Sequence, residues 1–159
     1  MRRGAVLLII SAMALLIGPI EARAGKQVRA LTNTDVFQVT DNDSHAIPLT
    51  EDGSTSKTVK LFGTTIIVSY NAECTAQGPD GSYLSVSILV DGKPTDPDSE
   101  TNSTFCSPTS NASHVYMAVV KNGVVSHVAG GDHTFQVIGT GVDTTLWQVH
   151  DMILTIISF

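Results

Sequence analysis

The chain has 159 residues, of which 42% are hydrophobic, 6% aromatic and 15% charged, and its formal net charge at pH 7 is −6. This length predicts one domain with one hydrophobic core. The acidic balance argues against nucleic acid and against an anionic membrane surface as partners, because phosphate groups are bound by clustered lysine and arginine side chains.

Residues 1–24, MRRGAVLLIISAMALLIGPIEARA, predict a secretory signal peptide. Two arginines open the segment, an apolar run follows, and the small-residue triplet Ala22-Arg23-Ala24 provides a cleavage site. A membrane anchor is the alternative, but a span needs about 20 apolar residues and Glu21 ends this run earlier. The predicted domain is therefore 25–159, secreted or periplasmic, with no membrane span after cleavage. Its six basic and fourteen acidic residues give a net charge of −8.

Beyond residue 25 the apolar residues alternate with polar ones, which is the period of a β-strand and not of a helix. In chain order we expect strands at 28–31, 36–39, 58–62, 65–70, 83–90, 115–120, 124–128, 134–138 and 146–157. The polar segments 41–56 and 93–111 are expected to be loops. No window of a dozen residues has the pattern of an amphipathic helix.

Glycine-containing segments separate these strands and predict the turns. Gly63 indicates a bend, Gly78-Pro79-Asp80-Gly81 and Asp91-Gly92 indicate turns, and Gly139-Thr140-Gly141 is expected to divide the last two strands. Asn122-Gly123, between two apolar runs, is the strongest hairpin signal. Short strands at this spacing predict an all-β fold, a single antiparallel β-sandwich of jelly-roll or immunoglobulin-like type.

Cys74 and Cys106 are the only two cysteines. Two cysteines in a small exported domain usually form a disulfide with each other. Closing a loop of about 33 residues is expected to stabilise the fold by about 3–4 kcal/mol. The alternative, a reactive thiol, is typical of an unpaired cysteine or a CxxC motif.

The segment GGDHTFQV, residues 130–137, combines a turn with a histidine. In a strand, His133 shares a face with Phe135 and Val137, so we expect it at the rim of the core, bonded to a neighbouring backbone group. A catalytic Asp132–His133 pair is the alternative. It would require a nucleophile or a substrate cleft, and the sequence shows neither.

The acidic stretch DGKPTDPDSETN offers Asp91, Asp96, Asp98 and Glu100 as weak calcium ligands. Calcium takes six to eight oxygen ligands, which acidic side chains and backbone carbonyls supply, but the spacing is not that of an EF-hand. A solvated loop is the alternative. No other cofactor is expected.

The serines, threonines and histidines form no catalytic or zinc-binding motif, so we expect a protein that is not an enzyme. The five histidines form neither HxH nor HExxH: His45, His114, His127, His133 and His150. Trp147, the only tryptophan, is interpreted as a core anchor, with an exposed sugar-stacking platform as the alternative.

Several stretches resemble a group of small exported bacterial β-sandwich proteins without an assigned activity. They are Ala72-Glu73-Cys74, YLSVSILVDG at 83–92, Phe105-Cys106, 131–137, and Trp147 with 151–156. The resemblance implies a jelly-roll or immunoglobulin-like sandwich with a Cys74–Cys106 bridge, and it carries over no catalytic residue. The final strand also resembles that of chaperone–usher fimbrial subunits, although those subunits place their first cysteine near the mature N-terminus.

The sequence thus predicts an exported, non-enzymatic β-sandwich module with a structural, adhesive or ligand-binding role toward a protein or glycan partner. One alternative is a chaperone–usher-type fimbrial or assembly subunit whose edge strand is completed by a neighbour. Another is a calcium-dependent carbohydrate-binding module.

Overall fold

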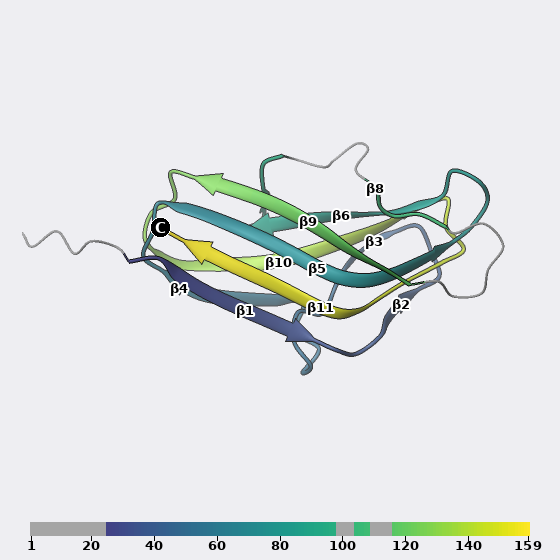
Figure 1. Ribbon diagram of the computed structural model, residues 1–159, viewed down its shortest axis with the longest axis horizontal. Helices are drawn as coiled ribbons and strands as arrows, with labels where there is room; N and C mark the ends of the chain where they lie inside the picture. Colours follow the sequence, from purple (N-terminus) through teal and green to yellow (C-terminus); the bar gives the residue numbers. More distant parts are fainter. Residues whose placement is uncertain (1–24, 98–103, 109–115) are drawn as a thin grey trace, which may run out of the picture.

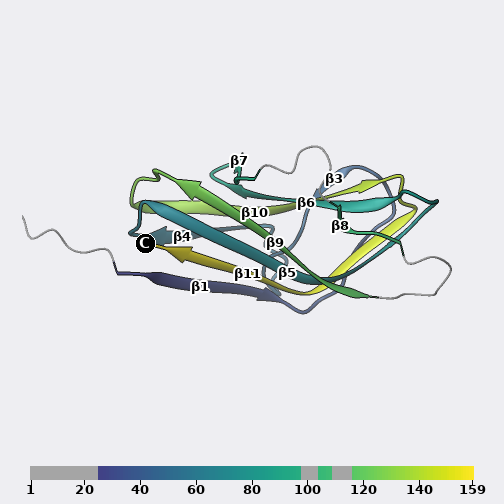
Figure 2. The ribbon, with the colours of Figure 1, turned by 45° about the horizontal axis from the view of Figure 1, so that its top comes forward.

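The computed structural model describes residues 25–97, 104–108 and 116–159. These residues form two antiparallel β-sheets that pack face to face, and no helix occurs in them (Figures 1 and 2). The predicted all-β sandwich is therefore confirmed. In the described part of the chain, no helix is long and apolar enough to cross a membrane.

The first sheet, sheet A, contains the C-terminal strand in its interior. Its strand order is β1 (Gln27–Asn33), β11 (Leu146–Ser158), β5 (Thr65–Gln77) and β9 (Met117–Ser126). The short β2 (Phe37–Val39) pairs with residues 147–149 of β11, and β1 pairs with residues 152–158. The strands β1 and β2 thus lie one after the other along the same side of β11, separated by residues 34–36.

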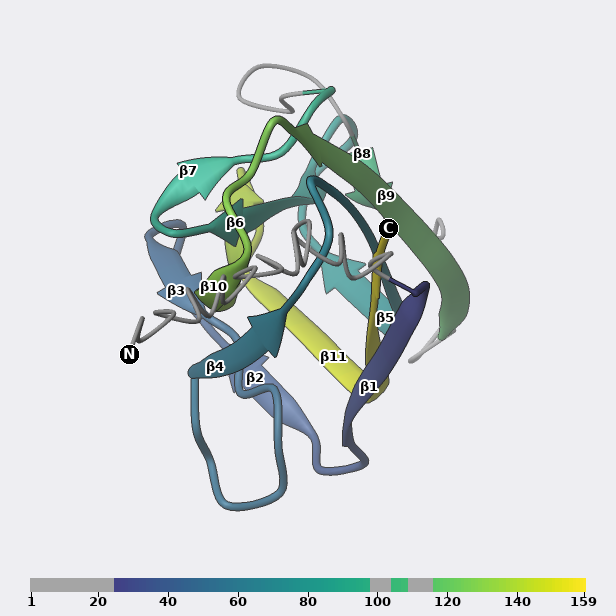
Figure 3. The ribbon, with the colours of Figure 1, turned by 90° about the vertical axis from the view of Figure 1, so that its left-hand side faces the viewer.

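The second sheet, sheet B, has two long central strands and several short edge strands. Its order is β3 (Ser44–Ala46), β10 (Gly131–Val142), β6 (Tyr83–Val90) and β7 (Lys93–Pro94). The strand β4 (Ser56–Leu61) also pairs with β10, and β8 (Thr104–Cys106) also pairs with β6. Viewed from one end, the two sheets enclose the interior between them (Figure 3).

The hydrophobic core lies between the sheets because the long strands bury every second side chain. Along β5, Ile66, Val68 and Tyr70 are fully buried, and Leu84 and Val86 repeat this pattern on β6. The largest core side chains also come from other strands: Trp147, Phe135, Leu61, Leu154 and Ile156. Trp147 has 0% of its surface exposed, which confirms its interpretation as a core anchor.

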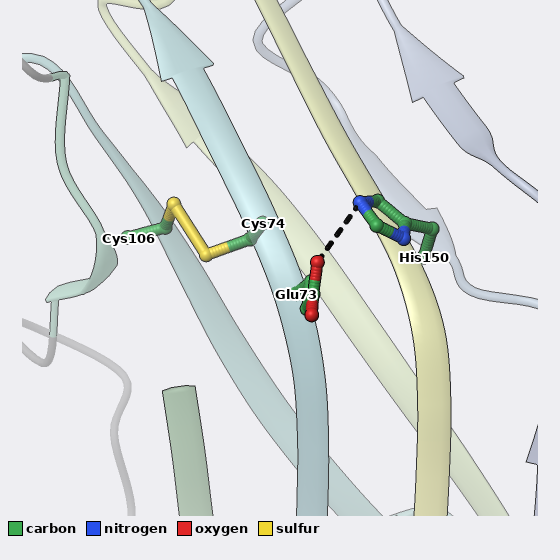
Figure 4. The surroundings of a disulfide bond; sticks show 4 residues. All are labelled: Glu73, Cys74, Cys106 and His150. Atoms are coloured by element: carbon green, nitrogen blue, oxygen red, sulfur yellow. Dashed lines mark ion pairs between the residues drawn. A yellow bond between two sulfur atoms is a disulfide. The ribbon is translucent and has the colours of Figure 1, made fainter. Parts of the chain in front are cut away.

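The disulfide between Cys74 and Cys106 is confirmed, and it joins the two sheets (Figure 4). Cys74 lies on β5 of sheet A and Cys106 on β8 of sheet B, with their Cα atoms 6.3 Å apart. Both residues are buried in the core. The bond therefore supports the sandwich across its interior as well as by closing a loop in the chain.

The hairpin predicted at Asn122-Gly123 is wrong, because β9 continues through both residues. Gly123 faces the interior opposite Val68, where a Cβ atom would lie less than 2.5 Å from the Thr95 hydroxyl. Glycine is thus required here by the close approach of Thr95 and not by a turn.

The division predicted at Gly139-Thr140-Gly141 is also wrong, since β10 extends to Val142. A Cβ atom on Gly139 would lie 2.8 Å from the Trp147 ring, and one on Gly141 would lie closest to the Thr144 hydroxyl and 3.0 Å from the Trp147 ring. Both glycines therefore make room for the indole. The turn follows instead at residues 143–145, between β10 and β11.

The segments expected to be loops contain short strands. Residues 41–56 include β3, and Ile47 and Leu49 that follow it are buried in the core. Residues 93–111 include β7 and β8. These strands have only two or three residues each, too few to show a periodic pattern in the sequence.

We expect Gly139→Ala to lower the free energy of unfolding by about 1–3 kcal/mol, because the added methyl group must displace Trp147 or Ile47. Urea unfolding followed by tryptophan fluorescence measures the change. Gly130→Ala is the matched control, since its Cβ would meet no atom closer than 3.7 Å. Equal stability of Gly139→Ala and the unaltered protein would contradict the assigned packing.

Candidate functional site

His133 occupies the position predicted from the sequence, at the rim of the core on β10. It is buried, and its inward neighbour Phe135 is fully buried. Its Nε2 atom lies 2.8 Å from the carbonyl oxygen of Ala129, which is the expected bond to a neighbouring backbone group. Its carboxylate partner is Asp91, in the turn after β6, and not the adjacent Asp132.

The His133–Asp91 contact joins the start of β10 to the β6–β7 turn. Asp91 accepts a hydrogen bond from His133 Nδ1 at 2.8 Å and another from the Thr134 backbone NH at 2.8 Å. Both imidazole nitrogens of His133 thus face oxygen acceptors, so both bonds form together only when the ring is protonated. This geometry is that of a structural ion pair that fixes a turn.

The pKa values of both partners are shifted in the directions that this pair requires. Burial lowers the pKa of His133, but the hydrogen bonds to Asp91 and to the Ala129 carbonyl outweigh it, so the net shift is upward from 6.5. The hydrogen bond from His133 lowers the pKa of the Asp91 carboxyl below 3.8. Asp91 is ionised and His133 is charged together in the pH range between these two pKa values.

Two of the four weak calcium candidates lie within the described residues. Asp91 is bound to His133 and Thr134, and the backbone of Asp96 pairs with Val124 of β9. Asp98 and Glu100 lie outside the described residues. The calcium hypothesis stays an untested prediction.

The outer face of sheet A has an unusual surface on its four long strands. Side chains that point away from the core form cross-strand rows on β1, β11, β5 and β9, which run side by side in Figure 1. We call three consecutive rows the uncharged rows: Val28–Ile157–Ile67–Val124, Ala30–Thr155–Ser69–Asn122 and Thr32–Ile153–Asn71–Val120.

These rows contain no charged side chain and several exposed aliphatic ones. The exposed fraction is 52% for Val28, 42% for Ile153 and 54% for Val120. In the described part of the chain, every large hydrophobic residue that is exposed within a strand belongs to sheet A. A solvent-facing sheet surface is normally polar, so this face is a candidate binding surface.

Beyond the uncharged rows, the same face ends in a cluster of metal-ligating side chains. Glu73 of β5 pairs with His150 of β11, with Glu73 Oε2 3.5 Å from His150 Nε2 (Figure 4). Asp151 Oδ2 lies 3.1 Å from the other ring nitrogen, Nδ1. One ligand atom from each of the three residues lies within 4.8 Å of the others. We call these three residues the His150 cluster.

A β-bulge in β11 brings Asp151 into this cluster. Val149 and Met152 are both buried, so the two residues between them both lie on the outer side, where a regular strand would place only one. Asp151 has a φ of 48°, in the left-handed region that aspartate tolerates better than most residues. The bulge therefore places two adjacent metal-ligating side chains, those of His150 and Asp151, on the same face of the sheet.

Neighbouring side chains fix the orientation of the His150 ring. The Tyr116 ring packs edge-on against it, with the centroids 4.3 Å apart and the planes at 83°. The Tyr116 hydroxyl donates a hydrogen bond to Gln148 Oε1 at 2.9 Å, and Gln148 in turn donates to Gln38 of β2. Tyr116 against the ring, with Glu73 and Asp151 at its two nitrogens, thus holds the imidazole in place.

Sequence reasoning missed the His150 cluster. The adjacent His150-Asp151 pair is visible in the sequence, but in a regular strand these residues point to opposite faces. Glu73 is far away along the chain, and only the register of β5 against β11 brings it near. The one available signal was an aspartate inside a long apolar strand, because aspartate tolerates the backbone conformation of a β-bulge better than most residues.

No family model and no curated protein matches this sequence. Solved structures do match: the infectious bursal disease virus VP2 subviral particle has 11% identity and a TM-score of 0.55 over 84% of this chain. The structure of the infectious bursal disease virus Gx strain has 12% identity and a TM-score of 0.51 over the same share. This chain spans 32% of each of those chains. The likeness shows the fold, a β-sandwich with jelly-roll-like neighbours.

We expect the free energy of unfolding to fall as the pH rises from about 6.5 through the raised pKa of His133, because the unfolded chain loses its proton first. It falls again below about 3.8, as Asp91 becomes protonated. His133→Gln should remove the first decline, which we expect to be on the order of 1–2 kcal/mol for charged hydrogen bonds. Urea unfolding at pH 5.5 and 8.5 measures it.

His45→Gln is the control for this experiment, because His45 makes an exposed contact with Asp41. It should keep the decline between pH 5.5 and 8.5. If His133→Gln also kept the fall in the free energy of unfolding between pH 5.5 and 8.5, the His133–Asp91 ion pair would not be the cause of this fall.

Proposed function

We propose that this chain is an exported, non-enzymatic β-sandwich module that acts by self-association through the outer face of sheet A. The observation that carries the proposal is the set of uncharged rows, a surface across four strands without a charged residue in an acidic protein. Depletion of charge at the centre of a surface is what distinguishes protein interfaces.

The partner that this surface fits best is a second copy of the chain. Two acidic molecules repel each other, but contact through the uncharged rows buries no carboxylate. Two such sheet faces can pack about 10 Å apart, as the sheets of a sandwich do. The three rows let aliphatic and small polar side chains of the two copies interdigitate.

The size of the surface sets the strength of the association. Four strands about 4.8 Å apart and three rows about 6.8 Å apart cover about 400 Å² on each copy. The total of about 800 Å² lies below the roughly 1,200 Å² of most stable complexes. The expected dimer is therefore weak and forms only at high protein concentration, unless several copies assemble together.

The alternatives raised by the sequence use other parts of the molecule. Completion by a neighbour's strand would have to use an edge strand of one of the sheets, because the C-terminal β11 is already paired on both sides. A sugar-stacking role for Trp147 does not fit its complete burial. Neither alternative relies on the outward-facing side chains of the uncharged rows.

Sedimentation equilibrium of residues 25–159, the segment that contains every described strand, tests the proposal over a range of protein concentrations. Val120→Glu should weaken the dimer at least tenfold, because it places a carboxylate in the interface of both copies. Thr58→Glu, at an exposed strand position of sheet B, is the matched control and should leave association unchanged.

A monomer at every concentration up to about 1 mM would refute the self-association, since a dissociation constant above this value corresponds to a binding free energy of less than about 4 kcal/mol. An equal loss in both variants would assign the effect to net charge and not to this face.

A further inference from the structure

We propose that the His150 cluster binds one divalent transition-metal ion, of which Zn²⁺ is the representative, through His150, Glu73 and Asp151. The site is independent of the proposed self-association, because its three ligands come from a single copy and lie beyond the uncharged rows.

The donor atoms fit such an ion. Imidazole nitrogen and carboxylate oxygen are both zinc ligands, and a site with three protein ligands leaves the remaining coordination to water. Calcium and magnesium prefer oxygen ligands throughout, so the imidazole selects against them. The set differs from the acidic stretch 91–100 in both its chemistry and its place in the fold.

The distances allow one ion to contact all three residues after a small movement. Ligand atoms bound at about 2.1 Å to one ion lie at most about 4.2 Å apart, and one ligand atom from each of the three residues already lies within 4.8 Å of the others. Glu73 Oε2 and Asp151 Oδ2 face different ring nitrogens, Nε2 and Nδ1, so the carboxylate at one nitrogen must rotate toward an ion bound at the other. The Glu73 and Asp151 side chains are 46% and 55% exposed, which leaves them room for this rotation. His150 is the more buried ligand, and Tyr116 holds its ring in place.

The local charge also favours a cation. Within the described residues, Glu73 and Asp151 each form an ion pair with His150 and with no lysine or arginine. Two carboxylates thus share one imidazole, which leaves a negative charge even when the ring is protonated. A dication that replaces the ring proton neutralises this excess.

Isothermal titration of residues 25–159 with ZnCl₂ at pH 7.5 tests the site, at a protein concentration where the chain is monomeric. We expect saturable binding of one ion per chain. His150→Gln should weaken it at least tenfold, and Glu73→Gln and Asp151→Asn should each weaken it severalfold. Asparagine accepts the left-handed backbone of residue 151, so Asp151→Asn retains the bulge.

The matched control is His45→Gln, which removes a histidine that lies 2.6 Å from an Asp41 carboxylate oxygen but belongs to no three-ligand group among the described residues. This variant should bind Zn²⁺ as the unaltered protein does, and CaCl₂ should give no heat that depends on Glu73. Thermal unfolding confirms that each variant is folded. Absence of saturable binding, or unchanged binding in both His150→Gln and Glu73→Gln, would overturn the proposal.

Discussion

The burial of alternate side chains along β5 and β11 is the constraint on which the rest of this structure depends. These two strands pair over most of their length at the centre of sheet A. Once Tyr70 and Leu154 face the core, the pleat determines which residues face outward, because a slip of one residue would expose the whole apolar set. The uncharged rows and the position of Glu73 are therefore consequences of how the core is packed.

The same periodicity explains which parts of the fold the sequence predicts. Long alternating runs identify β5, β6 and β11, and the Asp91-Gly92 turn has positive φ at both residues. Gly123 and Gly139 were misinterpreted because glycine serves two purposes that look alike in a sequence. One is a left-handed backbone, and the other is space for a neighbouring side chain. Neither of these glycines has a positive φ, and both face side chains distant in the chain.

The chemical contacts were harder to predict than the strands. His133 was correctly placed facing the core from its spacing to Phe135, yet its carboxylate partner lies 42 residues away in the chain, on the β6–β7 turn. The link between Glu73 and His150 likewise depends on the register of two strands and on a bulge. Alternation in one strand reveals which face a residue is on, but it contains no information about which strand lies beside it. Cys74 and Cys106 were the exception, because two cysteines leave only one pairing.

The disulfide and the bulge together fix the backbone of the His150 cluster beneath its two exposed carboxylates. Cys74 follows Glu73 directly and points to the opposite face of β5, where its bond to Cys106 ties this strand to sheet B (Figure 4). The backbone of Glu73 is thus held by a covalent link one residue away. On β11, buried Val149 and Met152 fix the backbone on both sides of His150 and Asp151. The exposed carboxylates can then rotate toward an ion without any change in the fold, which keeps the reorganisation needed for binding small.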